Sequence, residues 1–283
     1  MRRVLVLQLG WLSLSLLGGS LLAGSASAAV LYNNDIPDGR IGTASRPDTG
    51  NGERETADDF VLPTTSAITG AAFTGLIPTG AQVKNIVVEI YRVFPKDSQN
   101  PPSGKVPTRV NSPSDVAFDS RESGSGLQYT TSTLQNSFTV TDSVVNGISV
   151  NATPKEGSVT GQEVRFNVAF DTPFVLPNDH YFFVPQVELS NGDFLWLSAN
   201  RPIVVPGTPF APDLQSWIRN DPGIAPDWLR VGTDIIGGTT FNAAFLVAGT
   251  PVPEPSTYGM LALGLGFLGV WSARKRSNRS ATC

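Results

Sequence analysis

The chain has 283 residues, of which 40% are hydrophobic and 16% charged, and its formal net charge is −4. Its one histidine is His180 and its one cysteine is Cys283. This composition excludes a zinc site built from several imidazoles and a fold held by disulfides. The acidic balance also argues against nucleic acid as a partner.

The first 28 residues have the pattern of a secretory signal peptide. Met1-Arg2-Arg3 is a basic start, residues 4–17 are apolar, and the small residues Ala26 and Ala28 mark a cleavage site. We expect the general secretion machinery to export the chain and signal peptidase to cut after Ala28. The alternative is an uncleaved N-terminal anchor, and under either interpretation the body of the chain is exported.

Residues 29–250 predict one β-sheet domain. Val164, Phe166, Val168 and Phe170 alternate with polar or small residues, which is typical of a strand with one buried face. The sequence has no comparable helical stripe, and its prolines and glycines cluster between the strand patterns. We therefore expect an all-β fold, an antiparallel β-sandwich of the jelly-roll type. The other predicted strands cover residues 59–62, 72–77, 83–94, 137–145, 181–189, 193–198 and 240–248.

Two segments, residues 95–115 and 205–237, predict long loops because they are rich in proline and lack a sustained period. Trp217 and Trp228 lie in the second loop. An exposed indole could present a flat face to a sugar ring, which makes a carbohydrate-binding module the first alternative function. The opposing interpretation is that buried indoles pin the loop to the body.

Catalytic patterns are sparse, and we expect no enzymatic activity. The sequence has no Gly-x-Ser-x-Gly motif whose serine could pair with His180. We therefore expect His180 to lie in a turn or at the edge of a strand. A secreted carboxylate-dependent glycosidase, which needs only two acids, is the second alternative. The acids in or beside predicted strands are Asp58, Asp59, Glu89, Glu163 and Glu188.

Asp58 and Asp59 are also the candidate ligands for calcium, which is the one possible cofactor, because hard cations take six to eight oxygen ligands. Further oxygens come from the glycine-rich segment before them, but its spacing matches no defined loop. The alternative is structural, with one carboxylate facing solvent and the other bonding backbone.

Residues 251–283 have the three parts of a membrane-sorting tail. The two prolines of the first part hold an extended, accessible segment. Apolar residues 258–273 would span roughly 24 Å, slightly short of a hydrocarbon core. The basic end, residues 274–279, would stay in the cytoplasm, although a buried core helix is the alternative for the apolar part. The motif residues are Val252, Pro253, Glu254 and Pro255, and the basic stop is Arg274, Lys275 and Arg276.

This tail resembles the PEP-CTERM sorting signal of Gram-negative bacteria. The resemblance implies recognition by an exosortase, a membrane-embedded cysteine protease that cleaves near the motif. It implies transient residence in the inner membrane, followed by release to the outer envelope surface or extracellular matrix. The association of such tails with exopolysaccharide-producing bacteria implies a biofilm role, with extracellular polysaccharide as a partner.

The body resembles the β-sandwich ectodomains often attached to such tails. The resemblance rests on Leu31-Tyr32-Asn33-Asn34, Ala57-Asp58-Asp59-Phe60 and the stretch from Phe174 to Phe182. It implies a fold but no chemistry, because sandwiches carry many unrelated functions.

Removal of both ends would leave about 225 residues, enough to bury a core without disulfides. Six of the twenty basic residues and one of the 24 acidic residues lie in the removed segments, so the mature domain would have a net charge of about −9 and no cysteine. We therefore expect an exported, thiol-free, acidic β domain.

Overall fold

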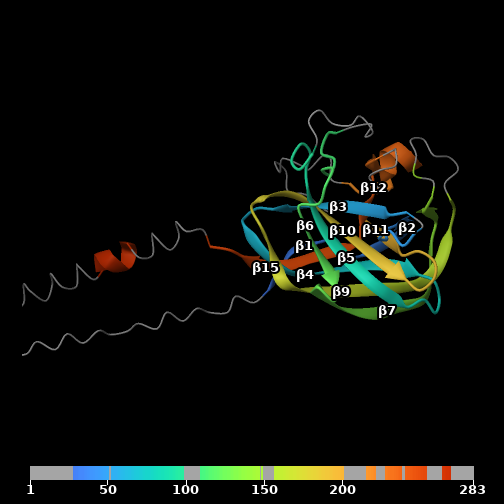
Figure 1. Cartoon of the computed structure of the whole chain (residues 1–283), viewed down its shortest axis with the longest axis horizontal. Helices are drawn as coiled ribbons and strands as arrows, with labels where there is room; N and C mark the ends of the chain where they lie inside the picture. The colour runs from blue at the N-terminus through green and yellow to red at the C-terminus, as the bar shows by residue number, and fades with distance from the viewer. Residues whose placement is uncertain are drawn as a thin grey trace, which may run out of the picture.

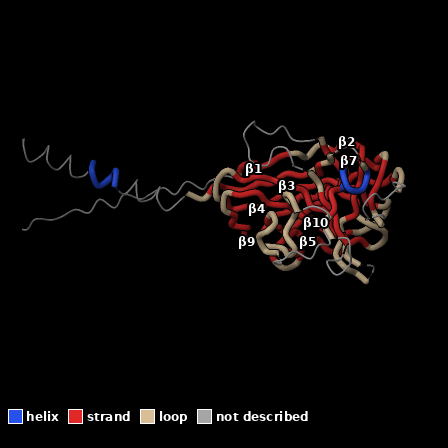
Figure 2. Tube along the Cα trace, turned by 90° about the horizontal axis from the view of Figure 1, so that it is seen from above, coloured by secondary structure: helices blue, strands red, loops and turns tan. Residues whose placement is uncertain are grey.

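The computed structural model describes residues 28–50, 52–98, 109–146, 148, 156–200, 215–220, 227–237, 240–253 and 263–268. Strands form most of the body, and loops lie at its margins (Figure 2). The prediction of an all-β fold is confirmed. The signal peptide lies outside the described residues except for Ala28.

The strands lie between Ala29 and Pro251 (Figure 1). Their bounds are β1 Ala29–Asn33, β2 Pro37–Ala44, β3 Arg54–Leu62, β4 Ser66–Ile77, β5 Val83–Arg92, β6 Asp119–Ser123, β7 Gly126–Val140, β8 Asp142–Val144, β9 Val159–Leu176, β10 Asp179–Leu189, β11 Leu195–Ala199, β12 Trp217–Asn220, β13 Leu229–Arg230, β14 Asn242–Ala243 and β15 Phe245–Pro251. A short π-helix, η2, covers Val231–Ile236, and residues 263–268 form one turn and a half of α-helix.

The strands are hydrogen-bonded into one mixed sheet in the order β13-β12-β3-β10-β5-β6-β7-β9-β4-β11-β2-β8. β15 pairs with β4 and β1, and β14 pairs with β11. Most pairs are antiparallel as predicted, but β2–β8 and β6–β7 are parallel. The β6–β7 contact is a tight loop that pairs Glu122 with Gly126, and Gly124 adopts a φ of 82° there. This loop joins the two halves of the structure into one sheet, and a jelly-roll order stays a prediction.

The two halves face each other across a core of aromatic rings. Phe183 of β10 stacks on Phe245 of β15, with ring centroids 5.3 Å apart, although these strands are not hydrogen-bonded neighbours. Phe73 of β4 stacks on Phe166 of β9 at 5.0 Å and lies 6.2 Å from Phe183. All four rings are fully buried. Contact between non-adjacent strands requires the sheet to fold over on itself.

The alternation predicted for Val164 to Phe170 is confirmed in β9. Val164, Phe166, Val168 and Phe170 are buried, whereas the residues between them are at least partly exposed. The prediction that residues 205–237 form a loop is wrong in part, because β12, β13 and η2 lie within it. β12 adds to the edge of β3, and this pairing depends on residues distant in the sequence.

The first and last strands lie side by side at one end of the body. β1 pairs with β15, and Ala29 is opposite Gly249 in this ladder (Figure 1). β15 also pairs along β4, where Pro251 is opposite Ser66. The two ends of the domain therefore leave the sheet next to each other.

The stacked core predicts a large difference between two Phe→Ala substitutions. Phe183→Ala should lower the free energy of unfolding by about 3–5 kcal/mol, because it leaves a cavity among packed rings. Phe118→Ala, at a ring that is 40% exposed, should cost less than about 1 kcal/mol. Equilibrium denaturation of the two variants measures the difference, and equal losses would contradict this description of the core.

Candidate functional site

The sorting motif leaves the body where the last strand ends. β15 ends at Pro251, and the N–H of Val252 donates to the carbonyl of Thr65 at 2.8 Å. The Val252 side chain is 37% exposed, and Pro253 is also exposed. Val252 and Pro253 thus follow the last strand with side chains that a protease could reach.

The rest of the predicted tail is only partly covered. Of the apolar residues 258–273, the structure describes 263–268, a short helix with exposed side chains. Within the described ranges, no helix has the length and apolar character needed to cross a membrane. The predicted residues outside the described part are Glu254, Pro255, Arg274, Lys275, Arg276 and, at the other end, Ala26.

The predicted signal cleavage site also coincides with a boundary of the sheet. β1 begins at Ala29, directly after the predicted cut behind Ala28. Because Ala29 pairs with Gly249, the N-terminus and the sorting tail leave the same end of the body.

The prediction that Trp217 and Trp228 contact sugars is wrong, because both side chains are fully buried. They pack against Ala57, Tyr91 and neighbouring residues on the face of the sheet opposite the aromatic core. The Trp228 indole N–H donates to the carbonyl of Ser114 at 2.9 Å. The two indoles therefore pin the segment around β12 to the body, which is the interpretation opposed to sugar binding.

A buried charged cluster lies beside these indoles. Arg219 of β12 is 3% exposed, and its Nε donates to Oε2 of Glu55 on β3. Its Nη2 donates to the Tyr91 hydroxyl at 2.9 Å, and its Nη1 donates to the carbonyl of Asp115 at 3.0 Å. The guanidinium lies 4.6 Å from the centroid of a Trp228 ring. A buried ion pair persists only when its remaining donors find partners, and here they do.

The Tyr91 hydroxyl links two carboxylates within this cluster. It lies 2.7 Å from Oε1 of Glu55 and 3.2 Å from Oε2 of Glu89, and its single proton can serve only one of them. Burial, and then the negative charge of Glu55, raise the pKa of Glu89 to about 8. Glu89 therefore holds a proton at neutral pH, as a general acid would. Its neighbours Glu55 and Tyr91 are buried, which favours a structural role.

Asp58 and Asp59 form a second buried cluster. The structural alternative expected one of the two carboxylates to face solvent, but neither does. Asp58 accepts a hydrogen bond from the N–H of Ala243 at 2.7 Å, and Asp59 accepts one from the N–H of Gln215 at 3.1 Å. The other oxygen of Asp59 lies 2.6 Å from Nε2 of His180. Both carboxylates thus hold backbone of the C-terminal segments against β3.

His180 is the second residue of β10, as predicted for a strand-edge histidine, and it is buried. Burial, and then the nearby Asp59, raise the pKa of Asp58 well above its ordinary value. Within the described ranges, no three His, Cys, Asp or Glu side chains form a group that could hold a metal ion. Backbone N–H groups bond one oxygen of each carboxylate, and the His180 ring lies against the other oxygen of Asp59.

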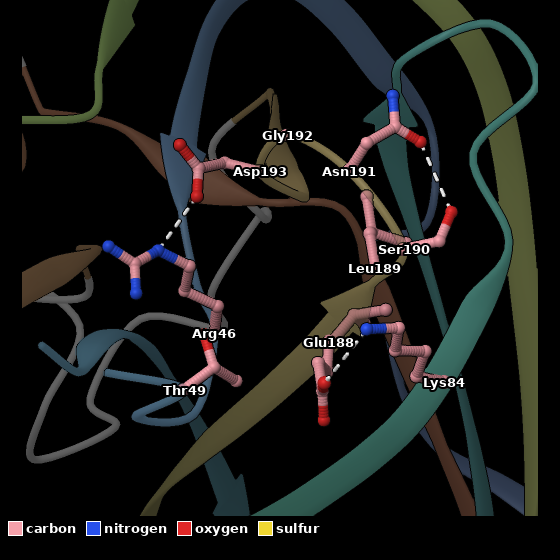
Figure 3. A pocket seen from close by; sticks show the side chains of 10 residues that line it. Arg46, Thr49, Lys84, Glu188, Leu189, Ser190, Asn191, Gly192 and Asp193 are labelled. Atoms are coloured by element: carbon pink, nitrogen blue, oxygen red, sulfur yellow. Dashed lines mark hydrogen bonds and ion pairs between the residues drawn. The ribbon is translucent and has the colours of Figure 1, made fainter. Parts of the chain in front are cut away.

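Described residues line two open clefts at the surface. The first has a volume of about 300 Å³ and a polar lining that includes Arg46, Lys84, Glu188 and Asp193 (Figure 3). Each acid in it is paired, since Arg46 Nε lies 2.7 Å from Asp193 and Lys84 Nζ lies 3.7 Å from Glu188. Of the five acids proposed for a glycosidase, this cleft contains Glu188 alone. Its charges neutralise one another in pairs.

The second cleft, of about 320 Å³, has an uncharged lining. Tyr129, Thr131 and Thr133 alternate along one face of β7 and form one wall. Gln82 and Gln162 contribute amides, and aliphatic side chains complete the surface. A row of hydroxyls and amides around one aromatic ring and an apolar floor suits a neutral polar ligand.

This uncharged cleft lies far from the sorting tail. β4 connects the two places, because Ser66 is opposite Pro251 at its start and Ile77 lines the cleft at its end. At about 3.3 Å per residue, the strand separates them by roughly 36 Å. The cleft and the end of β15 thus lie at opposite ends of β4.

Sequence reasoning missed the Arg219 cluster and the uncharged cleft. Glu89 and Tyr91 lie two residues apart in a predicted strand, so their shared face was a usable signal. Arg219 gave no signal because it lies in a segment predicted as loop. The polar face of β7 gave none because it lacks an apolar period.

The raised pKa of Glu89 predicts a pH dependence of stability. A carboxyl whose pKa is higher in the folded state stabilises the fold below its unfolded pKa of about 4.5, and this contribution is lost as the pH rises through about 8. Glu89→Gln should reduce the loss of stability between pH 5 and pH 9. Thermal unfolding across this range tests it. An unchanged pH profile would rule out a protonated Glu89 in the native protein.

Comparison with known proteins identifies the tail. Residues 251–276 match the family described as the PEP-CTERM protein-sorting motif. No curated protein and no solved structure matches the chain. A tail of this family implies an exported protein recognised by an exosortase, a membrane protease. With the motif placed directly after β15, the chain is a PEP-CTERM domain-containing protein.

Proposed function

We propose that this chain is a non-enzymatic protein of the cell surface or extracellular matrix, associated with exopolysaccharide or biofilm after exosortase-type sorting. The observation that supports this most directly is the position of the motif, which begins where β15 ends. Cleavage near the motif removes no strand and no core ring. The sorted product is then the complete β body, with the two halves of its sheet packed face to face.

We also propose that the protein catalyses no reaction, because its buried acidic side chains have structural partners. Glu55 pairs with Arg219, Asp59 with His180, and Asp58 with a backbone N–H. These contacts tie β3 to segments that lie later in the chain. They account for the acids without a reaction, and likewise without calcium, so we propose that the mature domain binds no cofactor.

Loss of the motif should block processing. In the producing cells, the protein with Pro253, Glu254 and Pro255 all replaced by alanine should accumulate with the inner membrane, because the protease loses the segment it recognises. Pro63→Ala, at an exposed turn, is the control. Intact-mass analysis of the exported wild-type chain should give a start at Ala29 and an end near Pro253. Recovery of exported chain ending in Cys283 would refute the sorting step.

A carbohydrate-binding role is the second candidate function, and the uncharged cleft favours it. The side chains of Thr131, Thr133 and Gln162 make no hydrogen bond to another described residue. Their polar atoms are therefore available to sugar hydroxyls. Tyr129 adds a ring that is partly exposed. The cleft thus takes the place of the two buried tryptophans as the proposed sugar contact.

Substitution in the cleft tests this second function. The double variant Tyr129→Ala with Thr131→Val should weaken binding of the producer's purified neutral polysaccharide by at least about tenfold, the effect of losing roughly 1.4 kcal/mol. Thr130→Val, on the opposite face of β7, should leave binding unchanged. Co-sedimentation measures both. Equal binding by all three proteins would place any sugar contact elsewhere, and release of reducing ends would support the glycosidase alternative.

A further inference from the structure

Among the strands that the structure describes, β7 has one edge that is unpaired over most of its length. It pairs with β9 along most of its length, but with β6 only through Gly126 and Leu127. From Gln128 onward, no described strand pairs with its other edge. Each second residue of this edge has an N–H and a C=O that pair with no described strand, the arrangement to which another strand can add.

The edge has none of the devices that usually prevent such addition. Residues 128–134 contain no charged residue and no proline. Their ladder with β9 is regular from Leu127 to Thr133, and the first register shift comes after Thr133. Native edge strands are normally protected by lysine, proline, bulges or short length. Six consecutive residues, 128–133, have none of these features and form a pairing surface.

Both faces of β7 are open over this stretch. Thr130, Thr131, Ser132 and Thr133 are all exposed, and Leu134 is 50% exposed. A strand added at this edge would therefore meet mostly short hydroxyl side chains, together with the ring of the partly buried Tyr129. It would also cover part of the exposed Leu134 side chain.

We propose that β7 pairs with β7 of a second copy of this chain, antiparallel and about a two-fold axis at Thr131. In this register, Tyr129 faces Thr133 of the other copy, Thr130 faces Ser132, and Thr131 faces itself. Aromatic with β-branched residues, and threonine with threonine or serine, are favourable cross-strand pairs. Two copies would thus form one sheet that is continuous through the dimer.

The self-complementary register is what identifies a second copy as the occupant. A two-fold contact uses the same patch on both partners, so each favourable pair occurs twice. The neutral segment also lets two acidic bodies approach, because no like charges meet at the edge. Since each mature copy has a net charge of about −9, added salt should strengthen the association by screening the repulsion between the bodies.

Charge substitutions on the outer face of β7 test the register. In the exported, processed protein, Thr130→Glu combined with Ser132→Glu places glutamates opposite each other twice, and should weaken dimerisation by at least about tenfold. Thr130→Lys combined with Ser132→Glu places lysine opposite glutamate twice, and should restore dimerisation. Sedimentation velocity over a wide concentration range measures both, and thermal unfolding checks that each variant is folded.

The control carries the same added charge away from the edge. Thr64→Glu combined with Thr172→Glu, at two exposed positions outside β7, should dimerise nearly as the wild type does. A wild-type protein that stays monomeric at all concentrations overturns the proposal. Equal dimerisation of the wild type and the two-glutamate β7 variant also overturns it, as does failure of the lysine–glutamate variant to recover.

Discussion

The stacking of Phe183 on Phe245 is the contact on which the rest of the fold depends. It joins β10, in one half of the sheet, to β15, in the other, and β15 leads directly into the sorting motif. Hydrogen bonds connect the halves at the short β6–β7 loop and beside β2, where the N–H of Val187 in β10 donates to the carbonyl of Ser45. Burial of the rings supplies the force that closes the sheet over its core.

The opposite face of β3 and β5 is closed by different chemistry. The segment around β12 covers it with two indoles, and Arg219 is neutralised there by Glu55 and surrounded by acceptors. Removing one partner of such a pair would leave an uncompensated buried charge, so the network fixes which segment can cover this face. In a domain without a thiol, these contacts do the anchoring that a disulfide provides in smaller secreted proteins.

Prediction succeeded where one side of a strand faces the core and the other faces solvent. Val164 to Phe170 of β9 has this environment, and its alternation was legible. Most of β7 was missed because both of its faces are exposed, so its side chains need no apolar period. The sequence placed Asp58 and Asp59 in or beside a predicted strand, and both lie in β3. Their burial depends on contacts with Ala243 and Gln215, which lie far along the chain.

By itself, the sequence determined the sorting signal and the class of fold. The sorting motif is a local signal that a protease reads along the chain, and period-two alternation is a local consequence of strand geometry. Only the tertiary structure decided that Trp217 and Trp228 are buried, that Glu89 shares a tyrosine with Glu55, and that β7 has a free edge. Each of these depends on which distant segments pack together, and no local pattern specifies that.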